Sequence, residues 1–163
     1  MIQHQDSPLS GHAGRHRLAA PTVVVVEDDA DIRTLIETIL TRAGMTVHGA
    51  STAGEGIALA SRLLPDLVTI DIGLPDADGL DVAAFLRDLT STRDIPILMI
   101  SASAHATEVE RARSRGAEAY LSKPFRPRQL REKVAALLAA ADTLPSTIGT
   151  PQCDECLTGV GAP

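Results

Sequence analysis

The chain has 163 residues, of which 44% are hydrophobic and 22% charged, a composition that is ordinary for a single globular domain. Its formal net charge of -6 argues against a surface that binds nucleic acids, and no segment approaches the roughly 20 apolar residues of a membrane span. The N-terminal segment also lacks the apolar run of a secretory signal, so we expect a cytoplasmic protein.

The first part of the chain is an expected tail, followed by alternating apolar runs and helical patterns. Residues 1–20 show no hydrophobic periodicity and are predicted to be disordered. Residues 23–26 are four consecutive valines, which predict a buried strand. Apolar residues at helical spacing follow over 32–40, and Gly44 is expected to end that helix. The second strand is predicted over 45–50.

A capping box opens the second predicted helix, because Thr52 is followed three residues later by Glu55. This helix is expected to end before Pro65. The third strand is predicted over 67–70, and apolar residues between 80 and 86 indicate the third helix.

The last part of the chain continues the same alternation. A strand is predicted over 95–100, a helix over 106–115 and a short strand over 119–122. A proline then opens the final helix, which is predicted over 127–141. Residues 142–163 are expected to form a flexible C-terminal tail.

Five strands that are each followed by a helix require crossover connections. The sequence therefore predicts an α/β fold with a doubly wound parallel sheet and helices on both faces. In such sheets, ligands bind outside the carboxyl ends of the strands. The polar residues that end or directly follow strands are Glu27, Asp28, Asp29, Asp71, Ser101 and Lys123. We expect all of them at one edge of the sheet.

Carboxylates clustered in this way indicate a divalent cation, and oxygen ligands suit Mg²⁺, which keeps several of its waters. A carboxylate beside Mg²⁺, a hydroxyl and a lysine is equipped for phosphoryl transfer, where catalysis is mostly positioning and charge neutralisation. The carboxylate can itself be the nucleophile and form an aspartyl phosphate.

Four separated segments, VVVVEDDADIR, LVTIDIGLPDADGLDV, ILMISAS and AYLSKPF, resemble in order and spacing the receiver domain of two-component response regulators. The likeness covers residues 21–141. It implies the flavodoxin-like (βα)5 fold with strand order 2-1-3-4-5. It also implies a signalling module that catalyses only its own Mg²⁺-dependent phosphorylation and dephosphorylation.

The resemblance assigns roles to the acidic residues. Asp71 matches the phospho-accepting aspartate, and Asp28 matches the principal Mg²⁺ ligand. Glu27 would assist through a metal-bound water. Gly73 would offer its backbone carbonyl to the metal. The side chain usually found at that position is missing, which would leave the phosphoryl group less screened from water.

The resemblance also assigns the remaining site residues. Ser101 stands where a hydroxyl bonds the phosphoryl group, and Lys123 supplies the cation. The bond from Lys123 to Pro124 is expected to be cis, which would aim the lysine into the site. Tyr120 matches an aromatic residue that swings inward when the Ser101 hydroxyl is drawn towards the phosphate.

The function implied is that of a stand-alone receiver, phosphorylated on Asp71 by a histidine kinase or a histidine phosphotransfer protein. Nothing after residue 141 is long enough for a DNA-binding output domain. The signal is therefore expected to leave through protein contacts of the fourth helix, fifth strand and fifth helix, or by phosphorelay transfer. The alternative is that the chain is the receiver fragment of a larger regulator.

Two other functions compete with this one. A receiver-like binding module that works without phosphate is disfavoured by the joint presence of Asp28, Asp71, Ser101 and Lys123. A phosphatase of the haloacid dehalogenase type would need its nucleophile in a D-x-D pattern at the first strand and an acidic pair late in the chain. This sequence has the reverse order.

Several other acidic residues have simpler explanations. Asp29 is expected to cap the first helix, and Asp31 to complement the positive end of that helix. The further acids Asp76, Asp78 and Asp81 are expected to be loop and helix-start residues. For Gly73 and Gly79, a role in turn geometry alone is the alternative explanation.

Arginine and lysine residues concentrate on the last two helices: Arg111, Arg113, Arg115, Arg126, Arg128, Arg131 and Lys133. A solvated helix face is the commoner explanation of such a pattern, and a docking surface for a partner is the alternative. The C-terminal tail holds one CxxC, Cys153 and Cys156, without the second pair that a zinc site needs.

Overall fold

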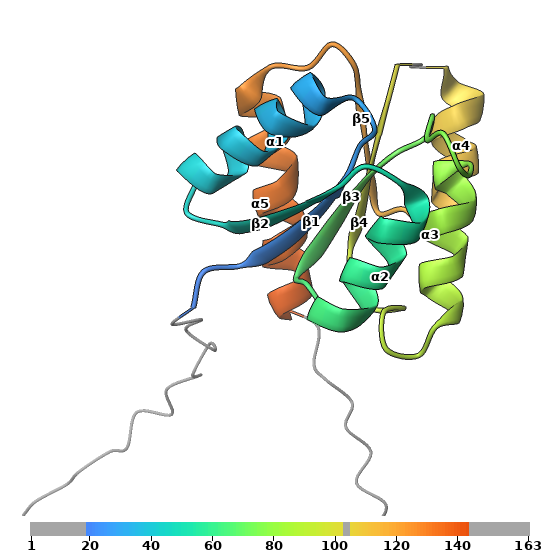
Figure 1. Cartoon of the computed structure of the whole chain (residues 1–163), viewed down its shortest axis with the longest axis horizontal. Coiled ribbons are helices and arrows are strands. Elements are labelled where there is room, and N and C mark those ends of the chain that lie inside the picture. The colour runs from blue at the N-terminus through green and yellow to red at the C-terminus, as the bar shows by residue number, and fades with distance from the viewer. Residues whose placement is uncertain (1–18, 103–104, 144–163) are drawn as a thin grey trace, which may run out of the picture.

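The computed structural model describes residues 19–102 and 105–143, over which strands and helices alternate along the chain (Figure 1). The strands are β1 (Thr22–Val26), β2 (Thr46–Ala50), β3 (Leu67–Asp71), β4 (Ile97–Ser101) and β5 (Ala119–Ser122). The helices are α1 (Ala30–Arg42), α2 (Ala53–Leu63), α3 (Gly79–Asp88), α4 (Ala106–Ser114) and α5 (Pro127–Thr143). Most of the two predicted tails, including Cys153 and Cys156, lies outside the described residues.

The five strands form one parallel sheet in the order β2-β1-β3-β4-β5. This confirms the predicted doubly wound α/β fold and the flavodoxin-like strand order. β2 lies on one side of β1 and β3 on the other, so the order reverses at β1. Ligands bind at such reversal points, outside the carboxyl ends of the strands. The edge beyond Val26 and Asp71 is therefore where a binding site is expected.

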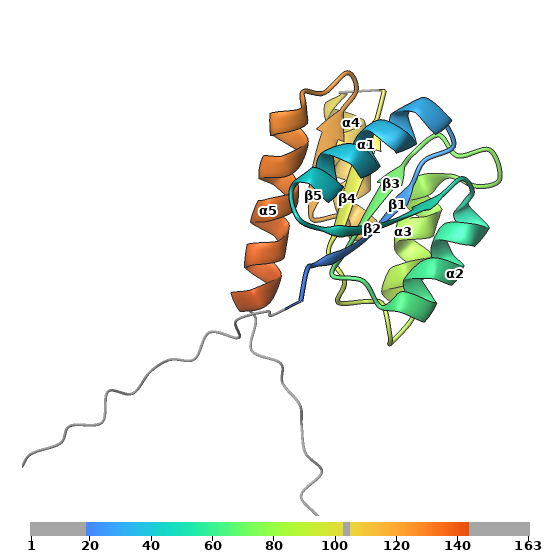
Figure 2. The same ribbon diagram turned by 60° about the vertical axis from the view of Figure 1, so that its left-hand side comes forward.

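Two helical layers cover the sheet, with α1 and α5 on one face and α2, α3 and α4 on the other (Figures 1 and 2). The valines of β1 alternate between the two layers. Val23 and Val25 belong to the cluster with α1 and α5, whereas Val24 and Val26 belong to the cluster with α2 and α3. All four are buried, and each contributes roughly 1.5–3 kcal/mol of hydrophobic stabilisation. β1 is therefore fixed in register, together with the acids that follow it.

The ends of the elements follow the predictions with small shifts. Gly44 and Gly116 adopt positive φ angles of 86° and 95°, and each follows the end of a helix as expected. β4 begins at Ile97, two residues later than predicted, because the amide of Ile95 donates to Thr92 in a turn and Pro96 has no amide hydrogen. α5 runs to Thr143, two residues beyond its predicted end.

Candidate functional site

The polar residues predicted to share one edge of the sheet do meet there. Glu27 follows β1, Asp71 ends β3, Ser101 ends β4, and Lys123 follows β5. Carboxylate oxygens of Glu27, Asp28 and Asp71 all lie within 4.8 Å of one another. Glu27 and Asp71 are buried, while Asp28 is exposed. The structure thus places three carboxylates around one point that opens to solvent at Asp28.

Lys123 joins two of these carboxylates. Its Nζ donates to Glu27 Oε1 at 3.0 Å and lies 3.1 Å from Asp71 Oδ2. Glu27 Oε2 also lies 2.9 Å from this nitrogen, but it accepts no hydrogen bond of good geometry within the described residues. One ammonium group thus pairs with two carboxylates of a cluster of three, and negative charge is left in excess.

The pKa shifts of Glu27 and Lys123 have a common origin in this crowding. Burial raises the pKa of Glu27, against the hydrogen bond from Lys123, and the nearby charge of Asp71 raises it further. Burial alone would lower the pKa of Lys123, but its contacts with Glu27 and Asp71 outweigh that effect and raise the pKa. The lysine is therefore held as a cation between the two acids.

Three clustered carboxylates with excess negative charge fit a hard divalent cation such as Mg²⁺. Glu27 Oε2 is buried and lies 2.9 Å from the Lys123 ammonium, but it accepts no hydrogen bond within the described residues, so it keeps the capacity to accept one from a metal-bound water. The acidic cluster therefore has the composition of a magnesium site.

Ser101 and Tyr120 connect this site to α4. Ser101 is buried, and its carbonyl accepts the amide of Lys123 at 2.7 Å, which fixes the start of the loop after β5. The Tyr120 hydroxyl donates to Glu108 Oε2 of α4 at 3.3 Å and is hydrogen-bonded to Ser101. Burial raises the pKa of Tyr120, the Ser101 hydrogen bond lowers it, and the charge of Glu108 raises it again. The peptide bond between Lys123 and Pro124 is cis, as expected.

Asp29 caps α1 as expected, because it accepts hydrogen bonds from the amides of Asp31 and Ile32 at 2.9 and 3.0 Å. Asp78, which was expected to be a loop or helix-start residue, is the N-cap of α3 and accepts from the amide of Leu80 at 2.9 Å. The predicted capping box of α2 forms with one difference, because Glu55 accepts from the amide of Ser51. These carboxylates are engaged at helix ends.

The two glycines near Asp71 differ in why they are needed. A Cβ on Gly79 would lie 2.1 Å from the carbonyl oxygen of Asp71, so this position requires glycine. A Cβ on Gly73 would meet no atom of the described part of the chain within 4 Å, and this residue does not have a positive φ angle. The alternative that Gly73 serves turn geometry therefore finds no steric support.

Two residues at the site were missed by sequence reasoning. Arg33 of α1 donates through Nη1 to the carbonyl of Glu27 at 2.7 Å and that of Asp28 at 3.3 Å, and so holds the turn that carries both acids. Asp76 was expected to be a loop residue, but it also accepts two amides at the start of α2. The DDADIR segment contained Arg33 without any pattern that indicated its partners.

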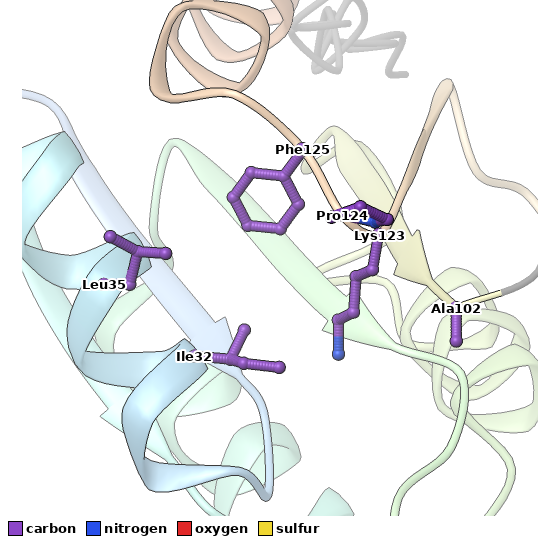
Figure 3. Close-up of a pocket in the computed structure, with 6 residues that line it drawn as sticks. All are labelled: Ile32, Leu35, Ala102, Lys123, Pro124 and Phe125. Carbon is purple, nitrogen blue, oxygen red and sulfur yellow. The ribbon is translucent and has the colours of Figure 1, made fainter.

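An apolar pocket of about 400 Å³ opens beside Lys123 (Figure 3). Ile32 and Leu35 of α1 form one wall, and Pro124 and Phe125 form the other. Leu35 is 47% exposed, which is high for a large apolar side chain. The pocket therefore presents apolar surface next to the acidic cluster.

The basic residues of α4 and α5 are partly engaged in ion pairs. Arg115 lies 2.9 Å from Asp81 of α3, and Arg128 lies 2.6 Å from Glu132 one turn further along α5. Exposed pairs of this kind contribute little to stability. Within the residues that the structure describes, no helix is long and apolar enough to cross a membrane.

Comparison with known proteins agrees with this geometry. The family model of the response regulator receiver domain matches residues 23–135. The chain belongs to the response regulator receiver domain family. A receiver is a signalling module of two-component systems, and the acidic cluster of Glu27, Asp28 and Asp71 lies where a receiver carries its magnesium site.

Similar receivers occur in longer proteins and as separate solved domains. The KDP operon transcriptional regulatory protein KdpE of Escherichia coli is 38% identical over 128 residues, which cover 77% of this chain and 56% of KdpE. The DNA-binding dual master transcriptional regulator RpaA of Synechocystis sp. is 37% identical over 125 residues, covering 77% of this chain and 52% of RpaA. This chain thus spans about half the length of these curated relatives.

A CheY-like response regulator receiver domain protein from Methanospirillum hungatei has a solved structure that superposes with a TM-score of 0.71 at 30% identity. The superposition covers 76% of this chain and 98% of that one. The receiver fold therefore accounts for most of the described residues.

Proposed function

We propose that this receiver is a phosphorylation-activated switch in which Asp71 accepts a phosphoryl group from a histidine kinase or a histidine phosphotransfer protein. One observation carries the proposal: the carboxylates of Glu27, Asp28 and Asp71 converge within 4.8 Å of one another. Lys123 Nζ lies beside them, 3.1 Å from Asp71 Oδ2. A carboxylate nucleophile, a cation and a set of metal ligands are the parts that phosphoryl transfer needs.

Each residue has a proposed role. An Asp71 carboxylate oxygen attacks phosphorus as the bond to the donor histidine breaks. Lys123 offers its ammonium group to the phosphoryl oxygens, and Ser101 offers a hydroxyl donor. Asp28, Asp71 and the Gly73 carbonyl would hold Mg²⁺, with Glu27 assisting through a water. When bound, Mg²⁺ would neutralise charge on the transferred group.

The pocket beside Lys123 supports a protein as the donor. A phosphohistidine that reaches Asp71 must come with its flanking residues, and Leu35 and Phe125 offer apolar contacts beside the site. Leu35→Asp should therefore reduce transfer from a phosphohistidine protein but leave phosphorylation by acetyl phosphate intact. An equal loss with both donors would contradict this role of the pocket.

The output is proposed to leave through the face formed by α4, β5 and α5, in a cytoplasmic protein. Tyr120 supports this route because its hydroxyl lies between Ser101 at the site and Glu108 on α4. The downstream partner would be a protein that distinguishes the two forms of this face.

The test is phosphorylation in vitro. Incubation with acetyl phosphate and Mg²⁺ should add one phosphoryl group, detected by intact mass, and chelation of the metal should prevent it. Asp71→Asn should give no adduct. Because a short-lived phosphate could escape detection, Mg²⁺-dependent binding of beryllofluoride should be measured in parallel. A wild-type chain that forms neither adduct would refute the proposal.

A further inference from the structure

The loop that follows β3 is closed at its base by backbone contacts, but Gly73 has no side chain to pack there. The amide of Gly79 donates to the carbonyl of Ile72 at 2.9 Å, and Gly73 forms an antiparallel bridge with Asp78. No side chain of the described residues fills the space where a Cβ of Gly73 would lie. Side-chain packing at that point therefore does not fix the Gly73 backbone, whose position depends on the bridge to Asp78 and on how the rest of the loop is held.

Asp76, at the outer end of this loop, is bound to a different element. Its Oδ1 accepts the amide of Ala53 at 2.8 Å, and its Oδ2 accepts the amide of Gly54 at 3.1 Å. These are the first two residues of α2. The two amides hold the pKa of Asp76 below its ordinary value of 3.8, so the carboxylate is charged at neutral pH. A bidentate contact across 22 to 23 residues of sequence ties the loop to α2.

The start of α2 divides its orphan amides between two sources. Thr52, the N-cap, accepts the amide of Glu55 through its side-chain hydroxyl. Asp76 accepts the amides of Ala53 and Gly54, which precede Glu55. α2 thus has its own cap, and the contact from Asp76 is a second one contributed by the loop.

α2 is itself anchored to the strand that carries the other acids. A Cβ on Gly56 would lie 2.5 Å from Cγ2 of Val26, so the first turn of α2 packs closely on the end of β1. Val26 is followed directly by Glu27 and Asp28. Asp76 and α2 therefore link the loop after Asp71 to the end of β1, which is followed by Glu27 and Asp28.

We propose that Asp76 is a positioning residue for the magnesium site. Because it fastens the loop to α2, it holds the Gly73 carbonyl at a fixed position relative to the carboxylates of Asp28 and Asp71. This inference rests on the proposed function, in which that carbonyl is a metal ligand. Groups that orient metal ligands typically affect metal affinity about 10- to 100-fold. Asp76 lies outside the ligand set and acts through the backbone of the loop.

The experiment compares Asp76→Ala with Thr52→Ala in the full chain labelled with ¹⁵N. Mg²⁺ alone is titrated while amide chemical shifts are followed, and amide hydrogen exchange is measured in the same samples. Asp76→Ala should raise the Mg²⁺ dissociation constant about 10-fold and speed exchange in the loop over 72–79. Thr52→Ala removes a cap from the same helix end, so it should lower stability while leaving Mg²⁺ affinity and loop exchange unchanged.

Asp76→Asn keeps one acceptor oxygen and should give an intermediate Mg²⁺ dissociation constant. This variant also provides a test if Asp76→Ala does not fold. Equal Mg²⁺ affinity in the wild type and the Asp76 variants would overturn the inference, as would an equal loss in Thr52→Ala. A wild-type chain whose amide shifts do not respond to Mg²⁺ would instead overturn the proposed metal site. Loop exchange that is unchanged in Asp76→Ala would overturn the tether itself.

Discussion

Asp28 and Asp29 are neighbours in the chain but contact different groups. The Asp28 carboxylate lies with Glu27 and Asp71, whereas Asp29 accepts two amides at the start of α1. We expect Asp28→Asn to abolish Mg²⁺-dependent phosphorylation by acetyl phosphate, because a carboxylate ligand is lost. Asp29→Asn should largely spare it, since asparagine also caps helices well. Intact mass after timed incubation measures both, and equal losses would show that these roles are wrongly divided.

Two buried threonines should respond oppositely to replacement by valine. The Thr69 hydroxyl in β3 finds no hydrogen-bond partner among the described residues, whereas the Thr92 hydroxyl donates to the carbonyl of Leu86 at 2.8 Å. Thr69→Val should raise the free energy of unfolding by up to about 1 kcal/mol, because a buried unsatisfied group is removed. Thr92→Val should lower it by about 1–3 kcal/mol. Urea denaturation measures both; destabilisation by Thr69→Val would indicate an ordered water at its hydroxyl.

At the scale of elements, α2 ends in a strained residue. Leu64 has a φ angle of 46°, a left-handed conformation that costs a residue with a Cβ, and its side chain is 53% exposed. Leu64→Gly should raise the free energy of unfolding by about 1 kcal/mol. Leu64→Ala retains the Cβ and serves as the control, because it removes the same exposed side chain without relieving the backbone. A gain of equal size in both variants would point to the side chain.

The helices and strands were predictable because local sequence patterns agreed with the burial of the same residues in the folded protein. Residues 23–26 are buried on both faces, as an unbroken valine run indicates, and Gly44 and Gly116 end helices in the backbone conformation that glycine favours. Where boundaries shifted, as before Ile97, a turn hydrogen bond decided the outcome. Such bonds depend on the folded geometry and leave no periodic pattern in the sequence.

The candidate site was predictable to the extent that strand ends determine it. Glu27, Asp71 and Lys123 meet because parallel strands present their carboxyl ends at one edge. Arg33 and Asp76 were not predictable in the same way, since each binds backbone groups rather than side chains. A backbone amide or carbonyl has no signature in the sequence, so its partner emerges only when the elements are packed.

Over the whole molecule, charge is balanced differently at the two ends of the sheet. Near the start of β4 and β5, Arg87 donates to the carbonyls of Gly116 and Ile95 and pairs with Glu118. That cation is met by carbonyl groups and one carboxylate. At the opposite end, Lys123 faces a cluster of three carboxylates. The end with excess negative charge is the one that can respond to a cation and to a change of charge on Asp71.

The fluorescence of Tyr120 can report whether a change at Asp71 reaches α4, because the chain contains no other tyrosine and no tryptophan. The Tyr120 hydroxyl is bonded to Ser101 at the site and to Glu108 on α4. If the Ser101 hydroxyl turns towards a group on Asp71, the Tyr120 hydrogen bonds must rearrange. Mg²⁺ with beryllofluoride should therefore change tyrosine fluorescence in the wild type but not in Asp71→Asn. Ser101→Ala should lose most of this change while still forming a phosphoryl adduct by intact mass. A full fluorescence change in Ser101→Ala would mean that the signal reaches α4 by another route.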